Sequence, residues 1–325
     1  MKLGKVVMTG KPRPAAERLI RERCEVQSWD EPGIMPRELL LQSMADAEGL
    51  MSVGSQVVKV DEELLSRAPK LRVISQSSVG YDNVDVLACT AKGIPFGNTP
   101  GVLTEATADL AFLLLLCAAR RIKESTAIVQ QGQWSQLVEI PLGVDLFGKN
   151  LGLIGMGQIG SAVARRAQAS GMNIIYHNRR RKPPEEENGA IYVEFAELLT
   201  QSDFIVVLIP LSNESRGLFS KQAFMQMKKT AFFINAARGS IVETQALYEA
   251  VKEGVIAGCA LDVTDPEPIP ADHPLLSMPN VLITPHIGSA TQETRDRMAM
   301  LAAENLILGL EKKPLKTCVN PSVNY

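Results

Sequence analysis

The sequence has few of the residues that build metal sites or disulfide frameworks. Its five cysteines are scattered along the chain, and no two of them form a C-x-x-C pair. That spacing predicts neither zinc ligation nor a disulfide framework and is typical of a protein from a reducing compartment. The first residues also lack the apolar core of a signal peptide, so we expect a cytoplasmic protein without a bound metal.

The sequence also lacks an excess of charge of either sign and any long hydrophobic run. The 34 Lys and Arg residues nearly balance the 36 Asp and Glu residues, which leaves a formal net charge of −2. Nucleic acids and membrane surfaces attract basic proteins, so neither is expected as a partner. The longest apolar run, residues 110–119, is about half of the roughly 20 residues that span a bilayer and predicts a buried helix.

What the sequence does have is a regular alternation of short apolar segments and helical segments over 325 residues. This length suggests two domains, and the alternation predicts parallel sheets with crossover helices. The expected fold class is α/β, with two doubly wound parallel-sheet lobes. Residues 104–131 and 291–310 are expected to form long helices. The expected strands are residues 5–8, 25–28, 49–52, 72–75 and 94–96, and then 151–155, 173–178, 204–209, 231–235, 257–263 and 281–284.

A glycine pattern at the start of the second series predicts a dinucleotide site. Residues 155–160 read Gly-Met-Gly-Gln-Ile-Gly, directly after an apolar strand and before an amphipathic helix. In that context Gly155 makes a tight turn, Gly157 lets the backbone approach a pyrophosphate, and Gly160 allows close helix packing. The amino terminus of the helix supplies unpaired N–H groups for the phosphates.

The end of the next strand bears on the choice between NADP(H) and NAD(H). An NAD site places Asp or Glu there to bind the ribose 2′-hydroxyl. Here the strand ends at Asn178, and Arg179, Arg180, Arg181 and Lys182 follow it. Because arginines can clamp a 2′-phosphate, the pattern favours NADP(H), with NAD(H) as the alternative. Arg179 and Arg180 are the candidate ligands, whereas Arg181 and Lys182 are expected to be solvated.

Only three histidines are present, which narrows the search for a proton donor near neutral pH. His177 lies at the adenosine end of the nucleotide unit, and His273 lies in a polar turn. His286 follows an expected strand, and Arg238 and Glu267 follow the two strands before it. Since the carboxyl ends of parallel strands meet at the ligand-binding edge of a sheet, we expect these three side chains to lie close together.

Such a trio can reduce a 2-oxo acid. The guanidinium of Arg238 can grip the carboxylate and polarise the ketone, and the imidazolium of His286 can donate the proton that becomes the hydroxyl hydrogen. The carboxylate of Glu267 can stabilise the charged imidazole and fix its tautomer. Arg238, Glu267 and His286 are therefore the catalytic candidates.

Five motifs together resemble the D-isomer-specific 2-hydroxyacid dehydrogenase family. They are residues 78–85 (SVGYDNVD), 155–160, 235–239 (NAARG), 261–268 (LDVTDPEP) and 285–289 (PHIGS). The stretches 272–278 and 285–294 are most similar to glyoxylate/hydroxypyruvate reductases, including the 2-ketogluconate reductase branch. The resemblance implies a Rossmann nucleotide domain, residues 104–287, inserted into a flavodoxin-like substrate domain, residues 1–103 and 288–325.

The resemblance also implies roles for individual residues. Val79 and Gly80 would bind the substrate carboxylate through backbone N–H groups, together with Arg238 and His286, and Asp262 would lie near the nicotinamide amide. Including the glycine and arginine candidates, cofactor contacts are expected from Thr104, Gly155, Gly157, Gln158, Ile159, Gly160, Asn178, Arg179, Arg180, Leu208, Pro210, Ala236, Asp262 and Gly288.

The expected activity is NADPH-dependent reduction of small 2-oxo acids to D-2-hydroxy acids. Glyoxylate, hydroxypyruvate and 2-ketogluconate are the candidate substrates, and the family implies a homodimer. Trp134 is expected to be a packed loop aromatic, the alternative being a contact with a partner's substrate pocket. Two other functions stay open, namely an NAD-dependent dehydrogenase with another substrate and a cofactor-sensing corepressor scaffold.

Overall fold

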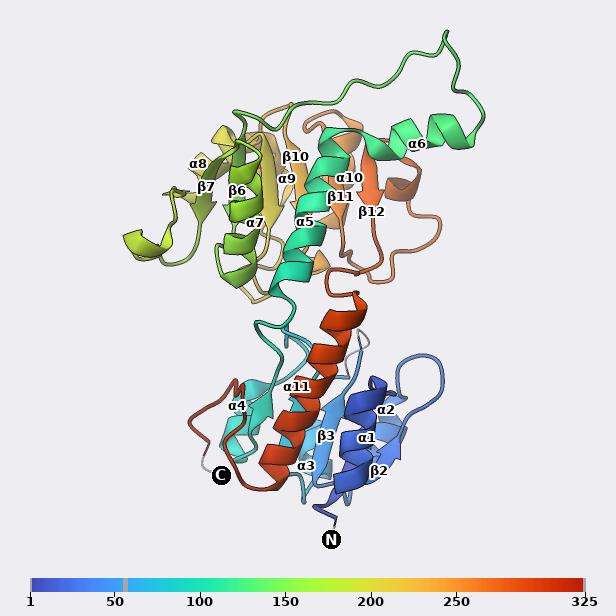
Figure 1. Ribbon diagram of the computed structural model, residues 1–325, viewed down its shortest axis with the longest axis vertical. Coiled ribbons are helices and arrows are strands. Elements are labelled where there is room, and N and C mark those ends of the chain that lie inside the picture. The colour runs from blue at the N-terminus through green and yellow to red at the C-terminus, as the bar shows by residue number, and fades with distance from the viewer. Residues whose placement is uncertain (1, 55–57, 324–325) are drawn as a thin grey trace. The chain divides into compact units, whose positions relative to one another are not determined.

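The computed structural model describes residues 2–54 and 58–323 in two compact units. Unit 1 contains the chain up to Leu103 and again from Ala290 onward, and unit 2 contains Thr104–Ser289. Each unit is a parallel sheet covered by helices on both faces (Figure 1). The predicted α/β class with two parallel-sheet lobes, one inserted in the sequence of the other, is therefore confirmed.

Unit 1 has a five-stranded sheet in the order β2-β1-β3-β4-β5, with every pair parallel. This is the flavodoxin-like order, in which the chain reverses direction across the sheet next to its first strand. The strands are short and mostly buried, as expected for a parallel sheet covered on both faces. They are β1 (Lys5–Met8), β2 (Glu25–Ser28), β3 (Gly49–Ser52), β4 (Val73–Gln76) and β5 (Phe96–Gly97).

The helices of unit 1 cover its sheet in two layers. One layer pairs α1 (Pro14–Arg23) with the long C-terminal helix α11 (Gln292–Leu310), although they lie far apart in the sequence (Figure 1). The hydroxyl of Thr291 caps α11 by accepting the N–H of Thr294, and Pro14 begins α1 where no backbone donor is needed. The other layer contains α2 (Arg37–Ser43), α3 (Glu62–Arg67) and α4 (Val86–Ala91).

Unit 2 has a seven-stranded parallel sheet in the order β12-β11-β10-β9-β6-β7-β8. Numbered from its own first strand, this is the Rossmann order 3-2-1-4-5-6 with one strand added beyond the sixth. The switch point lies at β6, whose carboxyl end leads into the glycine pattern. The strands are β6 (Asn150–Ile154), β7 (Asn173–His177), β8 (Ile191–Tyr192), β9 (Phe204–Val207), β10 (Phe232–Asn235), β11 (Gly258–Leu261) and β12 (Val281–Ile283).

Helices α5 (Thr104–Ala119) and α7 (Gln158–Ala169) pack together on one face of this sheet (Figure 1). The other face carries α8 (Phe195–Gln201), α9 (Lys221–Gln226) and α10 (Thr244–Lys252). The remaining helices are α6 (Ile122–Gln130) and the short 3₁₀ turns Pro184–Glu186, Gly239–Ile241 and Pro274–Ser277. Within the described part of the chain, no helix has both the length and the apolar character needed to cross a membrane.

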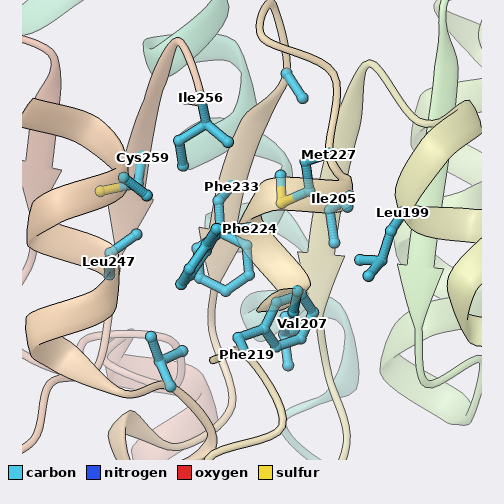
Figure 2. Close-up of a cluster of buried hydrophobic side chains, with 14 of the residues drawn as sticks. Leu199, Ile205, Val207, Phe219, Phe224, Met227, Phe233, Leu247, Ile256 and Cys259 are labelled. Atoms are coloured by element: carbon cyan, nitrogen blue, oxygen red, sulfur yellow. The ribbon is translucent and has the colours of Figure 1, made fainter. Parts of the chain in front are cut away.

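The α8–α10 face of unit 2 is held by a cluster of aromatic and aliphatic side chains. Phe219, Phe224 and Phe233 form its centre, and the ring centroids of Phe219 and Phe233 lie 4.7 Å apart (Figure 2). Buried aromatic pairs of this kind add stabilisation beyond the area that they remove from water. The cluster fixes β9, β10 and β11, so their carboxyl ends are held in register on a rigid support.

The prediction of one helix over residues 104–131 is wrong. The helix ends at Ala119 and restarts at Ile122, with Arg121 at a φ of 50°. The N–H of Val144 donates to the carbonyl of Ala119 over 2.8 Å. An uninterrupted helix would need that carbonyl for the N–H four residues on, so the returning loop replaces a helical hydrogen bond.

Three smaller expectations also fail. The sheet of unit 2 contains β8, a two-residue strand that was not expected because it is too short to show a periodic pattern. The apolar helix α5 is only partly buried, since Leu113 is 51% exposed, and Trp134 is not packed within the chain, since it is 71% exposed. Both side chains thus remain on the surface of unit 2.

Candidate active site

Three consecutive strands of unit 2 end in polar loops at one edge of its sheet. Arg238 follows β10, Glu267 lies in the loop after β11, and His286 follows β12. These strands are parallel neighbours in the sheet. Their carboxyl ends therefore meet at the edge where doubly wound sheets bind ligands.

His286 and Glu267 form a direct pair. Nδ1 of His286 lies 2.7 Å from Oε1 of Glu267, and both side chains are partly exposed. Burial by itself raises the pKa of Glu267, but the hydrogen bond with His286 and the charge of that ring outweigh it, so the pKa lies below its ordinary value. The nearby charge of Arg238 acts in the same direction. The carboxylate is therefore ionised at neutral pH, and it orients the ring so that Nε2 remains for a substrate.

The backbone of His286 is held in an uncommon conformation. Its φ is 53°, in the left-handed region that non-glycine residues seldom adopt. The N–H of His286 donates to the carbonyl of Asp262 over 2.9 Å. The buried carboxylate of Asp262 accepts the N–H groups of Ile287 and Gly288, each over 2.8 Å, and the hydroxyl of Thr284 over 2.7 Å. Asp262 thus fixes the loop that presents His286.

Arg238 lies in a turn that two neighbours shape. The side chain of Asn235 accepts the N–H of Ala237 and donates to the carbonyl of Arg238 over 2.9 Å. A Cβ at Gly239 would lie only 1.9 Å from the carbonyl oxygen of Thr264, so the loops after β10 and β11 are in backbone contact. That close approach holds Arg238 on the same side as Glu267.

The glycine turn has the shape of a dinucleotide cradle. Gly155 has a φ of +98°, which suits glycine, and a Cβ there would meet the backbone of Leu208 at 2.9 Å. A Cβ at Gly160 would lie 2.1 Å from the carbonyl oxygen of Gly155, whereas one at Gly157 would meet nothing within 4 Å. The residue that is expected to approach a pyrophosphate therefore faces open space at the amino terminus of α7, and the turn fits the cofactor.

The different surroundings of Gly157 and Gly160 predict opposite consequences when each is replaced by alanine. Gly157→Ala should leave the melting temperature nearly unchanged but raise KM for both NADPH and NADH about tenfold or more, since the added methyl group enters the space of the pyrophosphate. Gly160→Ala should lower stability by about 1–3 kcal/mol, as overpacking does. Thermal melts without cofactor and steady-state kinetics check both. Loss of stability in Gly157→Ala with an unchanged KM would contradict the assignment of this space.

The residues after β7 differ in their surroundings. The amide oxygen of Asn178 accepts the N–H of Met156 over 2.8 Å, which ties the strand end to the glycine turn. Arg179 and Arg180 are exposed. Arg181 is exposed, as expected, but it also forms a bidentate pair with the carboxylate of Glu187. Lys182 lies near Ser161 and Glu186, each at 3.4 Å.

The other two histidines have structural roles. Nδ1 of His177 lies 3.0 Å from the carbonyl oxygen of Val193, and its ring stacks on Tyr192. His273 caps the 3₁₀ turn after it, since its Nδ1 accepts the N–H of Leu275 over 3.3 Å. Among the described histidines, His286 is thus the one whose ring is paired with a carboxylate at the sheet edge.

The remaining cofactor candidates lie around the same edge of unit 2. The hydroxyl of Thr104, at the start of α5, donates to the side chain of Gln158 over 3.4 Å. Ala236 follows β10, and Leu208 and Pro210 follow β9. Gly288 lies against Asp262 and Thr107. Their contacts with a cofactor stay predictions.

Val79 and Gly80 belong to unit 1, in the loop after β4. The carbonyl of Val79 accepts the side-chain amide of Asn98 over 2.9 Å, and the carbonyl of Gly80 accepts from Ser78 and Gln76 over 2.7 and 2.8 Å. The loop therefore has its carbonyl groups engaged, which orients its peptide planes. Binding of a carboxylate by its N–H groups stays a prediction.

Sequence reasoning missed the residues that support these loops. Asn235, Asn98 and Gln76 are buried amides whose hydrogen bonds orient the loops of the candidate residues. Each is a polar residue that ends or directly follows an apolar strand. That position was the signal available in the sequence, because a buried polar group needs a hydrogen-bond partner.

Known proteins share both the fold and the sequence. The family model described as D-isomer specific 2-hydroxyacid dehydrogenase, NAD binding domain, matches residues 112–288, more than half of the chain. A glyoxylate reductase from Aeropyrum pernix is 44% identical over 329 residues, which cover 99% of this chain and 98% of the relative.

Two solved structures are similar over nearly their full length. A glyoxylate reductase from Paecilomyes thermophila has a TM-score of 0.90 and 35% identity, covering 99% of this chain and 100% of that one. An NADPH-dependent glyoxylate/hydroxypyruvate reductase from Sinorhizobium meliloti, in complex with NADP and malonate, has a TM-score of 0.88 and 31% identity, covering 99% and 98%.

These similarities confirm the family that the five motifs suggested. The match to an NAD binding domain also agrees with the glycine turn, whose shape fits a nicotinamide dinucleotide. The chain belongs to the D-isomer specific 2-hydroxyacid dehydrogenase family and is an oxidoreductase of the glyoxylate reductase type.

Proposed function

We propose that the protein uses NADPH to reduce glyoxylate and hydroxypyruvate to D-2-hydroxy acids, with His286 as the proton donor. The observation that carries the proposal is the 2.7 Å pair of His286 and Glu267 at the sheet edge that also bears Arg238. The printed names of the relatives support glyoxylate as the first substrate to test, and 2-ketogluconate is a larger candidate.

His286 would deliver its proton from Nε2 to the carbonyl oxygen of the substrate. The ionised Glu267 holds Nδ1 and stabilises the positive charge of the ring, so the proton to be transferred stands at Nε2. When bound, a reduced nicotinamide supplies the hydride that reaches the carbonyl carbon. After the transfer His286 is neutral, the substrate is a 2-hydroxy acid, and a proton from water restores the imidazolium.

Arg238 would bind the substrate carboxylate and polarise the carbonyl oxygen. A guanidinium presents two N–H groups in one plane, which suits a carboxylate beside a ketone. The backbone N–H groups of Val79 and Gly80 would add to the carboxylate contacts. Of these two contacts, the one with the carbonyl oxygen should contribute more to the rate, because the negative charge of that oxygen develops in the transition state.

Within the cofactor site, Gly155, Gly157, Gln158, Ile159 and Gly160 would hold the pyrophosphate. Thr104, Ala236, Asp262 and Gly288 would lie around the nicotinamide, and Leu208 and Pro210 would border the adenine. Arg179 and Arg180 would bind the 2′-phosphate, which NADPH has and NADH lacks. Two observations support NADPH: the strand end carries Asn178 where NAD sites carry an acid, and both arginines are exposed.

The test compares the two cofactors in the native enzyme and in one variant. Oxidation of NADPH and NADH is followed with glyoxylate, hydroxypyruvate, 2-ketogluconate and pyruvate. The native enzyme should prefer NADPH, and Arg179→Ala with Arg180→Ala should raise KM for NADPH about tenfold or more, with little change for NADH, because charge-assisted bonds to the phosphate are lost.

The outcomes separate the parts of this proposal. Turnover with NADH only would keep the catalytic groups and overturn the NADPH assignment, as would equal effects of the double variant on both cofactors. No turnover with any of the four acids would overturn the substrate assignment and favour another oxo acid or a scaffold function.

We extend the proposal to a homodimer built on α5 and the segment 131–148. This surface carries several large apolar side chains that are more than half exposed, an arrangement typical of protein interfaces. They are Leu113, Trp134, Leu137, Ile140, Leu142 and Phe147. A solution mass near 35.3 kDa, the mass of one chain, would overturn it.

A further inference from the structure

The loop after β7 places its arginines in two different environments. All three arginines are exposed, but Arg181 also donates from Nε to Oε1 of Glu187 over 2.8 Å and from a terminal nitrogen to Oε2 over 3.1 Å. This fork uses both carboxylate oxygens of Glu187, which is the strongest geometry that an arginine and a carboxylate can form.

Glu187 is an unusual partner for a surface arginine because it is buried. It is only 8% exposed, and the hydroxyl of the fully buried Tyr176 donates to its Oε1 over 2.7 Å. The hydrogen bond of Arg181 comes first and that of Tyr176 second in lowering the pKa of Glu187, so the carboxylate is ionised at neutral pH. A buried charge with three hydrogen bonds is satisfied and is costly to disturb.

Tyr176 also anchors the backbone of the loop. Its hydroxyl oxygen accepts the N–H of Lys182 over 3.0 Å. At the other end, Asn178 accepts the N–H of Met156 from the glycine turn over 2.8 Å. The two exposed arginines therefore lie between two fixed points only a few residues apart, one of which is part of the cofactor turn.

We propose that Tyr176, Arg181 and Glu187 are positioning residues that hold Arg179 and Arg180 where they can bind the 2′-phosphate of NADPH. The proposal rests on the NADPH preference proposed above and deepens it. A loop held in advance does not lose its freedom on binding, so the affinity for the phosphate is higher. Arg181 on this account acts through Glu187 and does not bind the phosphate itself.

The variant Glu187→Gln distinguishes positioning of the loop by Arg181 from direct binding of the phosphate by Arg181. The two roles predict different changes in KM for NADPH. The variant keeps the shape of the side chain and removes its charge, which weakens the fork with Arg181. If Arg181 positions the loop, KM for NADPH should rise about threefold to tenfold, the cost of ordering one or two side chains, while KM for NADH and kcat stay unchanged. If Arg181 binds the phosphate directly, releasing it from Glu187 should leave KM for NADPH unchanged or lower it, and the proposal fails.

Two further variants guard against a purely structural effect. Tyr176→Phe is milder, since it removes one hydroxyl, and it should shift the ratio of the two KM values in the same direction. Glu186→Gln is the matched control, because this neighbouring glutamate is exposed and pairs only loosely with Lys182, at 3.4 Å; it should shift nothing. Equal rises of both KM values in Glu187→Gln and Tyr176→Phe would show a structural role only and overturn the proposal.

Adding Glu187→Gln to the double variant of Arg179 and Arg180 separates this inference from the proposed function. Positioning predicts no further rise in KM for NADPH, since the arginines to be positioned are gone. A further rise of full size would overturn the inference alone. If the native enzyme does not prefer NADPH, or if the double variant is without effect, the proposed function and the inference fail together.

Discussion

Replacing His286 with glutamine is expected to lower kcat for glyoxylate reduction at least about a hundredfold, the usual size of a general-acid contribution. Glutamine keeps a hydrogen-bond donor at this place but has no proton to give near neutral pH. KM for NADPH should change little, because His286 is not among the residues expected to hold the cofactor. Steady-state kinetics with both substrates varied would measure the two effects.

His273→Asn is the matched control for this variant. Nδ1 of His273 accepts the N–H of Leu275 at a 3₁₀ turn, and an asparagine can take over that capping bond. The control should keep nearly all activity. A rate within about threefold of the native enzyme in His286→Gln would remove His286 from proton transfer, since general acids contribute at least about a hundredfold.

Glu267→Gln should act on the same step in a different way. The pKa of Glu267 lies below its ordinary value, so the carboxylate is ionised at neutral pH. Glutamine can still accept a hydrogen bond from Nδ1 of His286 but lacks this charge, so kcat for glyoxylate reduction should fall, though by less than in His286→Gln. Steady-state kinetics of the two variants in parallel would measure this order, and an equal loss in both would contradict it.

The placement of these groups could be predicted because it depends on topology. Apolar runs that alternate with helical segments specify a parallel sheet, and a parallel sheet brings every strand end to one edge. The sequence positions of Arg238, Glu267 and His286 after neighbouring strands therefore implied a shared site, and the structure places Glu267 and His286 in contact.

Other features depend on contacts between distant residues and left no local pattern. At the break in the helix near Arg121, the carbonyl of Ala119 accepts the N–H of Val144, 25 residues away along the chain, in place of a helical partner. Tyr176 and Glu187 meet through a loop that reads as a charged surface segment. Periodicity reports which face of an element is buried, but it does not report which loop returns to which carbonyl.

Asp262 shows a related difficulty within the site itself. The family resemblance suggested a position near the nicotinamide, and nothing in the sequence suggested a second task. The structure shows both of its carboxylate oxygens engaged by the loop of His286, through the N–H groups of Ile287 and Gly288 and the hydroxyl of Thr284. A residue can thus be identified by a motif while the hydrogen bonds that explain its presence stay hidden.

Replacing Arg238 with alanine is expected to lower kcat/KM for glyoxylate by about a hundredfold to a thousandfold, the range for removing a donor that stabilises a developing oxyanion. Part of the loss should be in KM, because the carboxylate of the substrate loses its partner, and part in kcat, because the carbonyl is no longer polarised. Arg67→Ala, which alters an exposed arginine in the last turn of α3, should leave both constants unchanged.

Arg238→Lys separates charge from geometry at the same position. Lysine keeps the positive charge but cannot present two N–H groups in one plane, so it should restore the binding of the carboxylate more than the rate. The guanidinium donates to the carbonyl of Ala237 over 2.9 Å, but the turn should survive both changes, because the side chain of Asn235 and the close approach of Gly239 to Thr264 also hold it. Near-native kcat/KM in Arg238→Ala, with a melting temperature like that of the native enzyme, would show that the substrate is held by other groups. Glu267 and His286 would still be paired in that case. Proton transfer would therefore remain assigned to His286, and carboxylate binding would be assigned to residues other than Arg238.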